Sequence, residues 1–141
     1  AAGIVSPWAD PSRLKLVDSQ PKAAIGKLLA HLALAISAEG MKEALLFGDA
    51  TGLTAAETLD LLDSTGLSFM ANLKRDFVLG DRSTDPGDFT VDALCKDSKL
   101  MLDTAGQVLP GIQAAVESFT IQQDHSRGDH DFSAILVHRS E

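Results

Sequence analysis

The chain has 141 residues, of which 45% are hydrophobic, and this suits one globular domain with a single core. Its formal net charge is −8 and its lysines and arginines form no dense patch, which argues against a nucleic acid or an anionic membrane as the partner. The single cysteine, Cys95, excludes an internal disulfide and fits a reducing compartment, so we expect a cytoplasmic protein.

Residues 1–20 are expected to form a linker or arm, because Pro7 and Pro11 interrupt regular structure there. Pro21 suits the first turn of a helix, where its missing N–H is not needed. The folded domain is therefore expected to cover residues 21–141.

Residues 22–48 contain the longest apolar stretch, and no proline interrupts it. Apolar side chains recur there at helical spacing, at Ile25, Leu28, Leu29, Leu32 and Ile36. Such a helix would be about 40 Å long, and a helix that is apolar nearly all round is usually buried. Lysines and glutamates also punctuate the stretch, and each charge at mid-bilayer costs about 2.5 to 3.5 kcal/mol. We therefore expect the central helix of a soluble domain and not a membrane span.

Shorter helices are expected to follow this central one. Thr54 and Glu57 have the spacing of a capping box, and Asp131 can cap a last short helix. The expected ranges are 54–62, 68–77, 90–108, 111–123 and 132–137, with a turn-rich loop at 80–88. In the third helix we expect four side chains to face the core: Phe69, Met70, Leu73 and Phe77. No segment alternates as a strand would, so the fold class is all-α, with about six helices wrapped around one long central helix.

Lys27 and His31 are four residues apart and share one face of the central helix. A lysine beside another cation or an apolar wall has its pKa lowered toward neutrality, which suits proton transfer. The alternative is an ordinary lysine at the edge of the helix and a histidine packed in the core. Spacing alone favours this alternative, because such pairs are common in helices.

Several other polar residues have plain structural interpretations. The segment with His125, Asp129, His130 and Asp131 offers metal ligands, but its spacing matches no standard zinc pattern, so we expect a loop and no metal site. We expect Glu39 and Glu43 to lie on a solvated or interface face. Two further residues are expected to serve packing or capping only: Cys95 and Ser133.

Four segments together resemble a known family. Residues 26–32 (GKLLAHL) and 38–45 (AEGMKEAL) are similar to the long helix of the β-hydroxyacid dehydrogenases, which include 3-hydroxyisobutyrate dehydrogenase and tartronate semialdehyde reductase. Residues 95–100 (CKDSKL) resemble the Lys-Asp-Leu segment of that family, and residues 131–134 (DFSA) resemble its Asp-x-Ser-Ala segment. The resemblance is to the all-helical C-terminal domain, which is related to that of 6-phosphogluconate dehydrogenase.

The resemblance implies a substrate-binding and dimerisation domain of an NAD- or NADP-dependent enzyme that acts on a small hydroxy acid. It implies that Lys27 is the catalytic acid/base and that Lys96 lies near the bound cofactor, with Asp97 holding that segment in place. His31 stands where the family usually has an asparagine that orients the substrate. The alternative for Lys96 and Asp97 is a surface ion pair, which is worth little.

The sequence contains no Gly-x-Gly-x-x-Gly turn, which cradles the cofactor pyrophosphate in a Rossmann domain. We therefore expect that an N-terminal Rossmann domain is missing here, that this chain alone holds no cofactor, and that it is inactive by itself. The alternative function is a non-catalytic helical dimerisation or interaction module. A homodimer is expected in both cases, because five short helices can hardly cover so long an apolar helix.

Overall fold

The computed structural model describes residues 20–141, so the expected N-terminal arm lies almost entirely outside the described residues. Within this part of the chain there are six helices and no strand. Their bounds are α2 Gln20–Ala50, α3 Ala55–Leu62, α4 Ser68–Val78, α5 Val91–Ala105, α6 Pro110–Asp124 and α7 Ala134–Val137. The expected all-α fold is confirmed.

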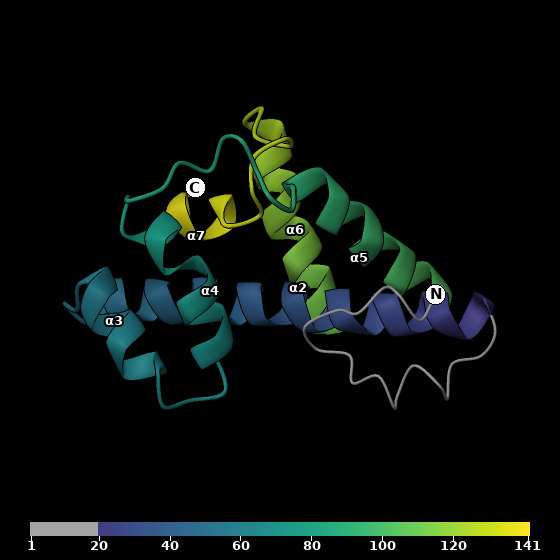
Figure 1. The fold of residues 1–141 in the computed structure, drawn as a ribbon, viewed down its shortest axis with the longest axis horizontal. Helices are drawn as coiled ribbons and strands as arrows, with labels where there is room; N and C mark the ends of the chain where they lie inside the picture. Colours follow the sequence, from purple (N-terminus) through teal and green to yellow (C-terminus); the bar gives the residue numbers. More distant parts are fainter. Residues whose placement is uncertain (1–19) are drawn as a thin grey trace.

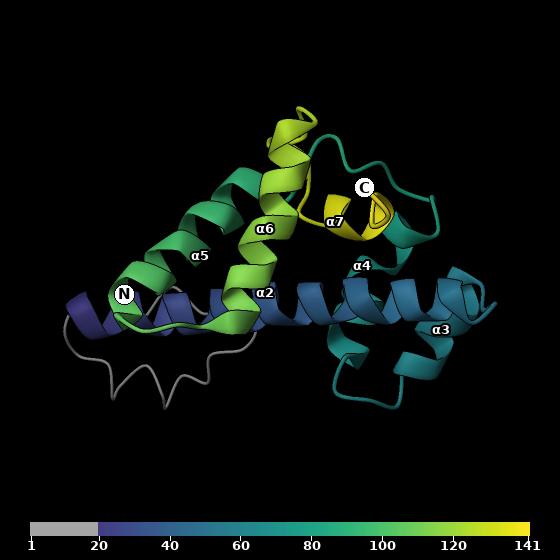
Figure 2. The ribbon, with the colours of Figure 1, turned by 180° about the vertical axis from the view of Figure 1, so that it is seen from behind.

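The long helix α2 runs the whole length of the domain and contacts every other described helix (Figure 1). Helices α5 and α6 pack against each other over its N-terminal half, while α3, α4 and α7 gather around its C-terminal half. The view from behind shows the same two groups (Figure 2). The largest fully buried side chains come from all six helices and the segment before α7, so the core is continuous along α2: they include Met41, Leu59, Met70, Leu94, Ile112, Phe119, Phe132 and Ile135.

Helix α2 is not buried all along, as expected for an apolar helix too long for five short helices to cover. Met41 and Leu45 are wholly buried, but Ile25 and Leu29 in the first turns are largely exposed. Helices α5 and α6 lie on one side of this end. A shallow apolar groove of about 270 Å³ runs here between α2 and the end of α5. By length and composition residues 22–50 of α2 could also cross a membrane, a test that core helices of soluble proteins pass as well.

Local sequence signals predicted some helix ends correctly. The capping box of α3 is present: Thr54 Oγ1 accepts a hydrogen bond from Glu57 N at 3.1 Å, and Thr54 N donates to Glu57 Oε1 at 3.0 Å. Helix α5, expected to reach residue 108, ends at Ala105, because Gly106 adopts a left-handed conformation with φ of 64°. Only glycine takes that conformation without steric cost, so the helix stops there.

The prediction of which α4 side chains face the core is half wrong. Met70 and Phe77 are buried, but Phe69 and Leu73 are 53% and 45% exposed. The inner face of this helix carries Lys74 instead, which is buried. A charged residue takes a core position here because it has an ionic partner from another segment, described below.

Glu39 also differs from the expectation of a solvated or interface face. Its side chain is buried, and Ser118 Oγ on α6 donates a hydrogen bond to Glu39 Oε1 at 2.6 Å. Lys42 Nζ in turn donates to Ser118 Oγ at 2.9 Å. This chain of polar contacts joins α2 to α6, and only Glu43 of the expected pair is exposed.

Candidate functional site

The structure brings two of the four candidate site residues into direct contact. His31 on α2 and Asp97 on α5 are 66 positions apart in the sequence, yet His31 Nδ1 lies 2.5 Å from Asp97 Oδ2. The two side chains are only 16% and 25% exposed. An ionised carboxylate can only accept hydrogen bonds, so the shared proton belongs to Nδ1 of the imidazole. The contact therefore fixes both the position and the donor nitrogen of His31.

Phe89, in the loop before α5, forms a second wall for His31. The centroids of the two rings are 4.9 Å apart and their planes meet at 74°, an edge-to-face arrangement. On its other side Phe89 packs edge-to-face on Phe132, with centroids 6.0 Å apart. The imidazole is thus held between a carboxylate and an aromatic ring, in a fixed orientation.

The side chains of the other two candidate residues, Lys27 and Lys96, are exposed. Lys27 lies one helical turn before His31 on α2, and Lys96 directly precedes Asp97 on α5. Neither side chain makes a hydrogen bond or an ion pair with the described residues. Both ammonium groups are therefore open to a ligand or to another domain.

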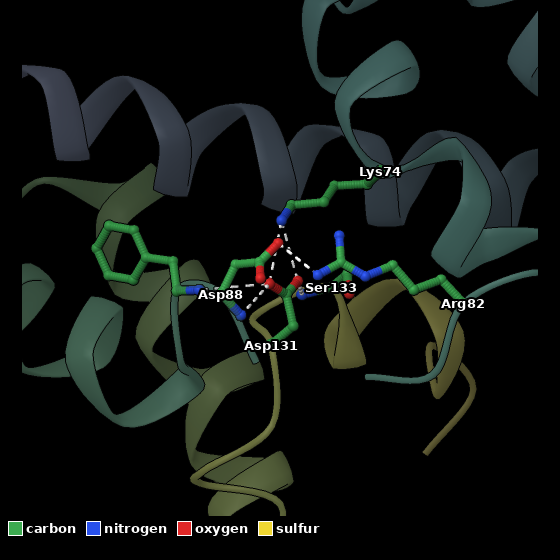
Figure 3. Close-up of polar contacts among 6 residues, drawn as sticks. Lys74, Arg82, Asp88, Asp131 and Ser133 are labelled. Atoms are coloured by element: carbon green, nitrogen blue, oxygen red, sulfur yellow. Dashed lines mark hydrogen bonds and ion pairs between the residues drawn. The ribbon is translucent and has the colours of Figure 1, made fainter. Parts of the chain in front are cut away.

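Behind this site, Asp131 joins α4 to the segment before α7 (Figure 3). Lys74 Nζ contacts both oxygens of Asp131, at 3.0 and 3.2 Å, and both side chains are almost completely buried. The ammonium also lies over the ring of Phe132, 4.2 Å from its centroid. Ser133 N donates to Asp131 Oδ1 at 2.9 Å. These contacts give a buried ion pair in which both partners are satisfied.

The same carboxylate anchors the loop that carries Phe89. Asp131 Oδ2 lies 3.3 Å from the backbone N of Asp88 and 3.5 Å from that of Phe89, and Phe132 N donates to Phe89 O at 2.8 Å. Gly87 fits closely here, because a Cβ atom at this position would come within 2.3 Å of Asp131 N. Asp131 therefore sets the position of Phe89, and through it the aromatic ring that packs on His31.

Burial alone would raise the pKa of Asp131, but hydrogen bonds from Ser133 and the charge of Lys74 outweigh it and hold that pKa below its usual value. The expectation that Asp131 caps helix 132–137 needs correction: α7 begins only at Ala134, and the carboxylate closes the turn before it. Sequence reasoning missed Lys74 altogether. No local signal marks it, because its partner is 57 positions away.

Among the residues described by the structure, no group of three or more His, Cys, Asp or Glu side chains is arranged to hold a metal ion. His130 Nδ1 instead lies 2.8 Å from Thr84 Oγ1. Cys95 is buried, and its burial raises the pKa of the thiol, which disfavours the reactive thiolate.

The exposed side chain of Lys96 fits one contact to the phosphate or ribose of a dinucleotide approaching from outside. The described residues form no strand and no glycine-rich turn that would enclose a pyrophosphate. The described residues therefore offer no cradle for the pyrophosphate itself.

No curated protein matches the sequence. A family model described as "NAD-binding of NADP-dependent 3-hydroxyisobutyrate dehydrogenase" matches residues 22–138. That range contains all six described helices apart from the first residues of α2, and it includes Lys27, His31 and Asp97. The chain therefore belongs to this family of NAD-binding helical domains of the 3-hydroxyisobutyrate dehydrogenase type.

Proposed function

We propose that this chain is the substrate-binding and dimerisation domain of a β-hydroxyacid dehydrogenase that uses NAD or NADP, and that Lys27 is its acid/base. The observation that carries the proposal is the contact between His31 and Asp97. It joins α2, which contains Lys27, to the segment that contains Lys96. The two segments whose residues resemble the family's site thus meet at one place, although they are far apart in sequence.

Oxidation of a hydroxy acid removes a hydride from carbon and a proton from the hydroxyl oxygen. The nicotinamide of a bound dinucleotide would supply the hydride acceptor, and Lys96 would contact that dinucleotide. Lys27 would take the proton in this direction and return it in the reverse reaction. The exposure of Lys27 at the domain surface suits an active site formed between two domains.

The test of this role is turnover of the intact protein together with its dinucleotide-binding domain. Lys27→Ala should lower turnover about 100-fold or more, the usual contribution of a positioned acid/base. Lys99→Ala, which removes an exposed lysine of α5, is the matched control and should leave turnover unchanged. Equal turnover of the two variants would refute the catalytic role of Lys27.

We also propose that two copies of the chain associate through the apolar groove between α2 and the end of α5. The groove of about 270 Å³ is lined by the largely exposed side chains of Ile25 and Leu29. Exposed patches of this kind mark interaction sites. Leu29→Glu should shift the sedimentation coefficient from dimer to monomer at micromolar concentration. Leu61→Glu on α3 is the control, because Leu29 and Leu61 are 61% and 62% exposed. A wild-type chain that sediments only as monomer would refute the dimer.

The alternative function, a non-catalytic dimerisation module, draws on the same groove between α2 and the end of α5. It predicts that the protein dimerises but shows no turnover that depends on Lys27. The two measurements above therefore separate the two functions.

A further inference from the structure

Of the two ring nitrogens of His31, one is hydrogen-bonded and the other has no partner among the described residues. Nδ1 is bound to Asp97 at 2.5 Å. Nε2 makes no hydrogen bond with the described residues, and it is not among their buried unsatisfied atoms, of which Ser133 Oγ is the only one. Solvent therefore reaches Nε2. In a neutral imidazole whose Nδ1 carries the proton, this nitrogen is a hydrogen-bond acceptor.

Helix geometry puts Lys27 within reach of this acceptor. Side chains of an α-helix lean toward its N-terminus, so a residue covers the turn that precedes it. His31 on α2 therefore covers the turn that contains Lys27, and Cβ atoms four residues apart are about 5 to 6 Å from each other. The flexible stem and three N–H donors of a lysine can span that gap.

Neither Nε2 of His31 nor Nζ of Lys27 has a hydrogen-bond or ionic partner among the described residues. The side chain of Lys27 has no other hydrogen-bond or ionic partner there, and Phe89 and Asp97 prevent the imidazole from turning away. The arrangement resembles a carboxylate–imidazole pair that orients a third group, here Lys27.

We propose that Asp97 and His31 form a positioning relay for Lys27: Asp97 holds His31 in the tautomer that carries the proton on Nδ1, and His31 Nε2 accepts a hydrogen bond from Lys27 Nζ. His31 and Asp97 are then positioning residues that act through Lys27. This inference rests on the proposed role of Lys27 and deepens it, because it states what holds the lysine in place.

The test is ¹⁵N NMR of the histidine ring in the 141-residue chain, near neutral pH and without ligand. The wild type should show the proton on Nδ1 of His31, and Asp97→Ala should lose this preference. Retention of the Nδ1–H tautomer in Asp97→Ala would overturn the role of Asp97. Dispersed amide signals confirm that each variant is folded.

The decisive variant is Lys27→Met, because Lys27 is exposed and its replacement does not disturb the core. This change should displace the Nε2 signal of His31, since the nitrogen loses its donor. Lys96→Met is the matched control, because it removes an equal charge beside Asp97 and should leave the signal in place. An Nε2 signal that is unchanged in Lys27→Met, or that moves equally in both variants, would overturn the relay.

Failure of the relay and failure of the proposed function are distinguishable. Turnover of Lys27→Ala in the intact protein tests the catalytic role, whereas the ring signals test only what holds Lys27. An essential Lys27 with an unaffected Nε2 signal would leave the function standing and remove the relay. A displaced Nε2 signal in Lys27→Met together with full turnover of Lys27→Ala would support the relay and refute the catalytic role of Lys27.

Discussion

Replacement of Lys74 by methionine should be among the most destabilising single changes on α4. It leaves the carboxylate of Asp131 fully buried with three backbone N–H contacts but without a counter-charge. Breaking a buried ion pair by removing one partner costs about 3 to 5 kcal/mol. The whole free energy of unfolding of a domain is about 5 to 15 kcal/mol, so the loss would be a large share of it.

The assay is urea unfolding at pH 7 followed by circular dichroism. With a slope of about 2 kcal/mol per molar, a loss of this size lowers the unfolding midpoint by about 2 M. Arg75→Met is the matched control, since Arg75 is the next residue on α4 and its ion pair with Asp60 is exposed. Such surface pairs contribute about 0 to 1 kcal/mol. A midpoint for Lys74→Met equal to that of Arg75→Met would refute the reasoning.

The effect should also depend on pH in a defined direction. The pKa of Asp131 is lower in the folded protein than in the unfolded chain, so the unfolded chain binds more protons in acid. The stabilisation is therefore complete above about pH 4, near the unfolded value for aspartate, and is lost as the pH falls through the lower folded value. The stabilities of wild type and Lys74→Met should converge below pH 4. A constant difference between pH 7 and pH 3 would contradict this linkage.

Three further changes have expected outcomes. Gly48→Ala should destabilise the fold by about 1 to 3 kcal/mol in thermal unfolding, because the new Cβ atom would lie 2.2 Å from Thr58 Oγ1. Gly26→Ala on the same helix has open space around its Cβ atom and should stabilise the fold. Stability changes of the same sign for the two variants would contradict this. Thr54→Ala removes the capping box of α3 and should cost about 1 kcal/mol by the same measurement, and an unchanged melting temperature would argue against it. Cys95 should react with a thiol reagent far more slowly in the folded chain than in urea, because burial raises the pKa of its thiol; equal rates would show that it is accessible.

The sequence by itself determined the features that depend on neighbours within a few residues. The all-α class, the long α2 and the capping box at Thr54 follow from helical periodicity and from hydrogen bonds between residues three or four apart. The placement of Lys27 and His31 on one face of α2 also follows from that period. These predictions succeed because the interactions that cause them are local.

Tertiary structure alone decided which side chains meet across the fold. The contact of His31 with Asp97 spans 66 positions, and that of Lys74 with Asp131 spans 57. No sequence pattern encodes such pairs, because they depend on how α4 and α5 pack against other segments. Periodicity indicated Phe69 and Leu73 as core residues, but α4 turns its Lys74 face inward, where a partner charge offsets the cost of burial.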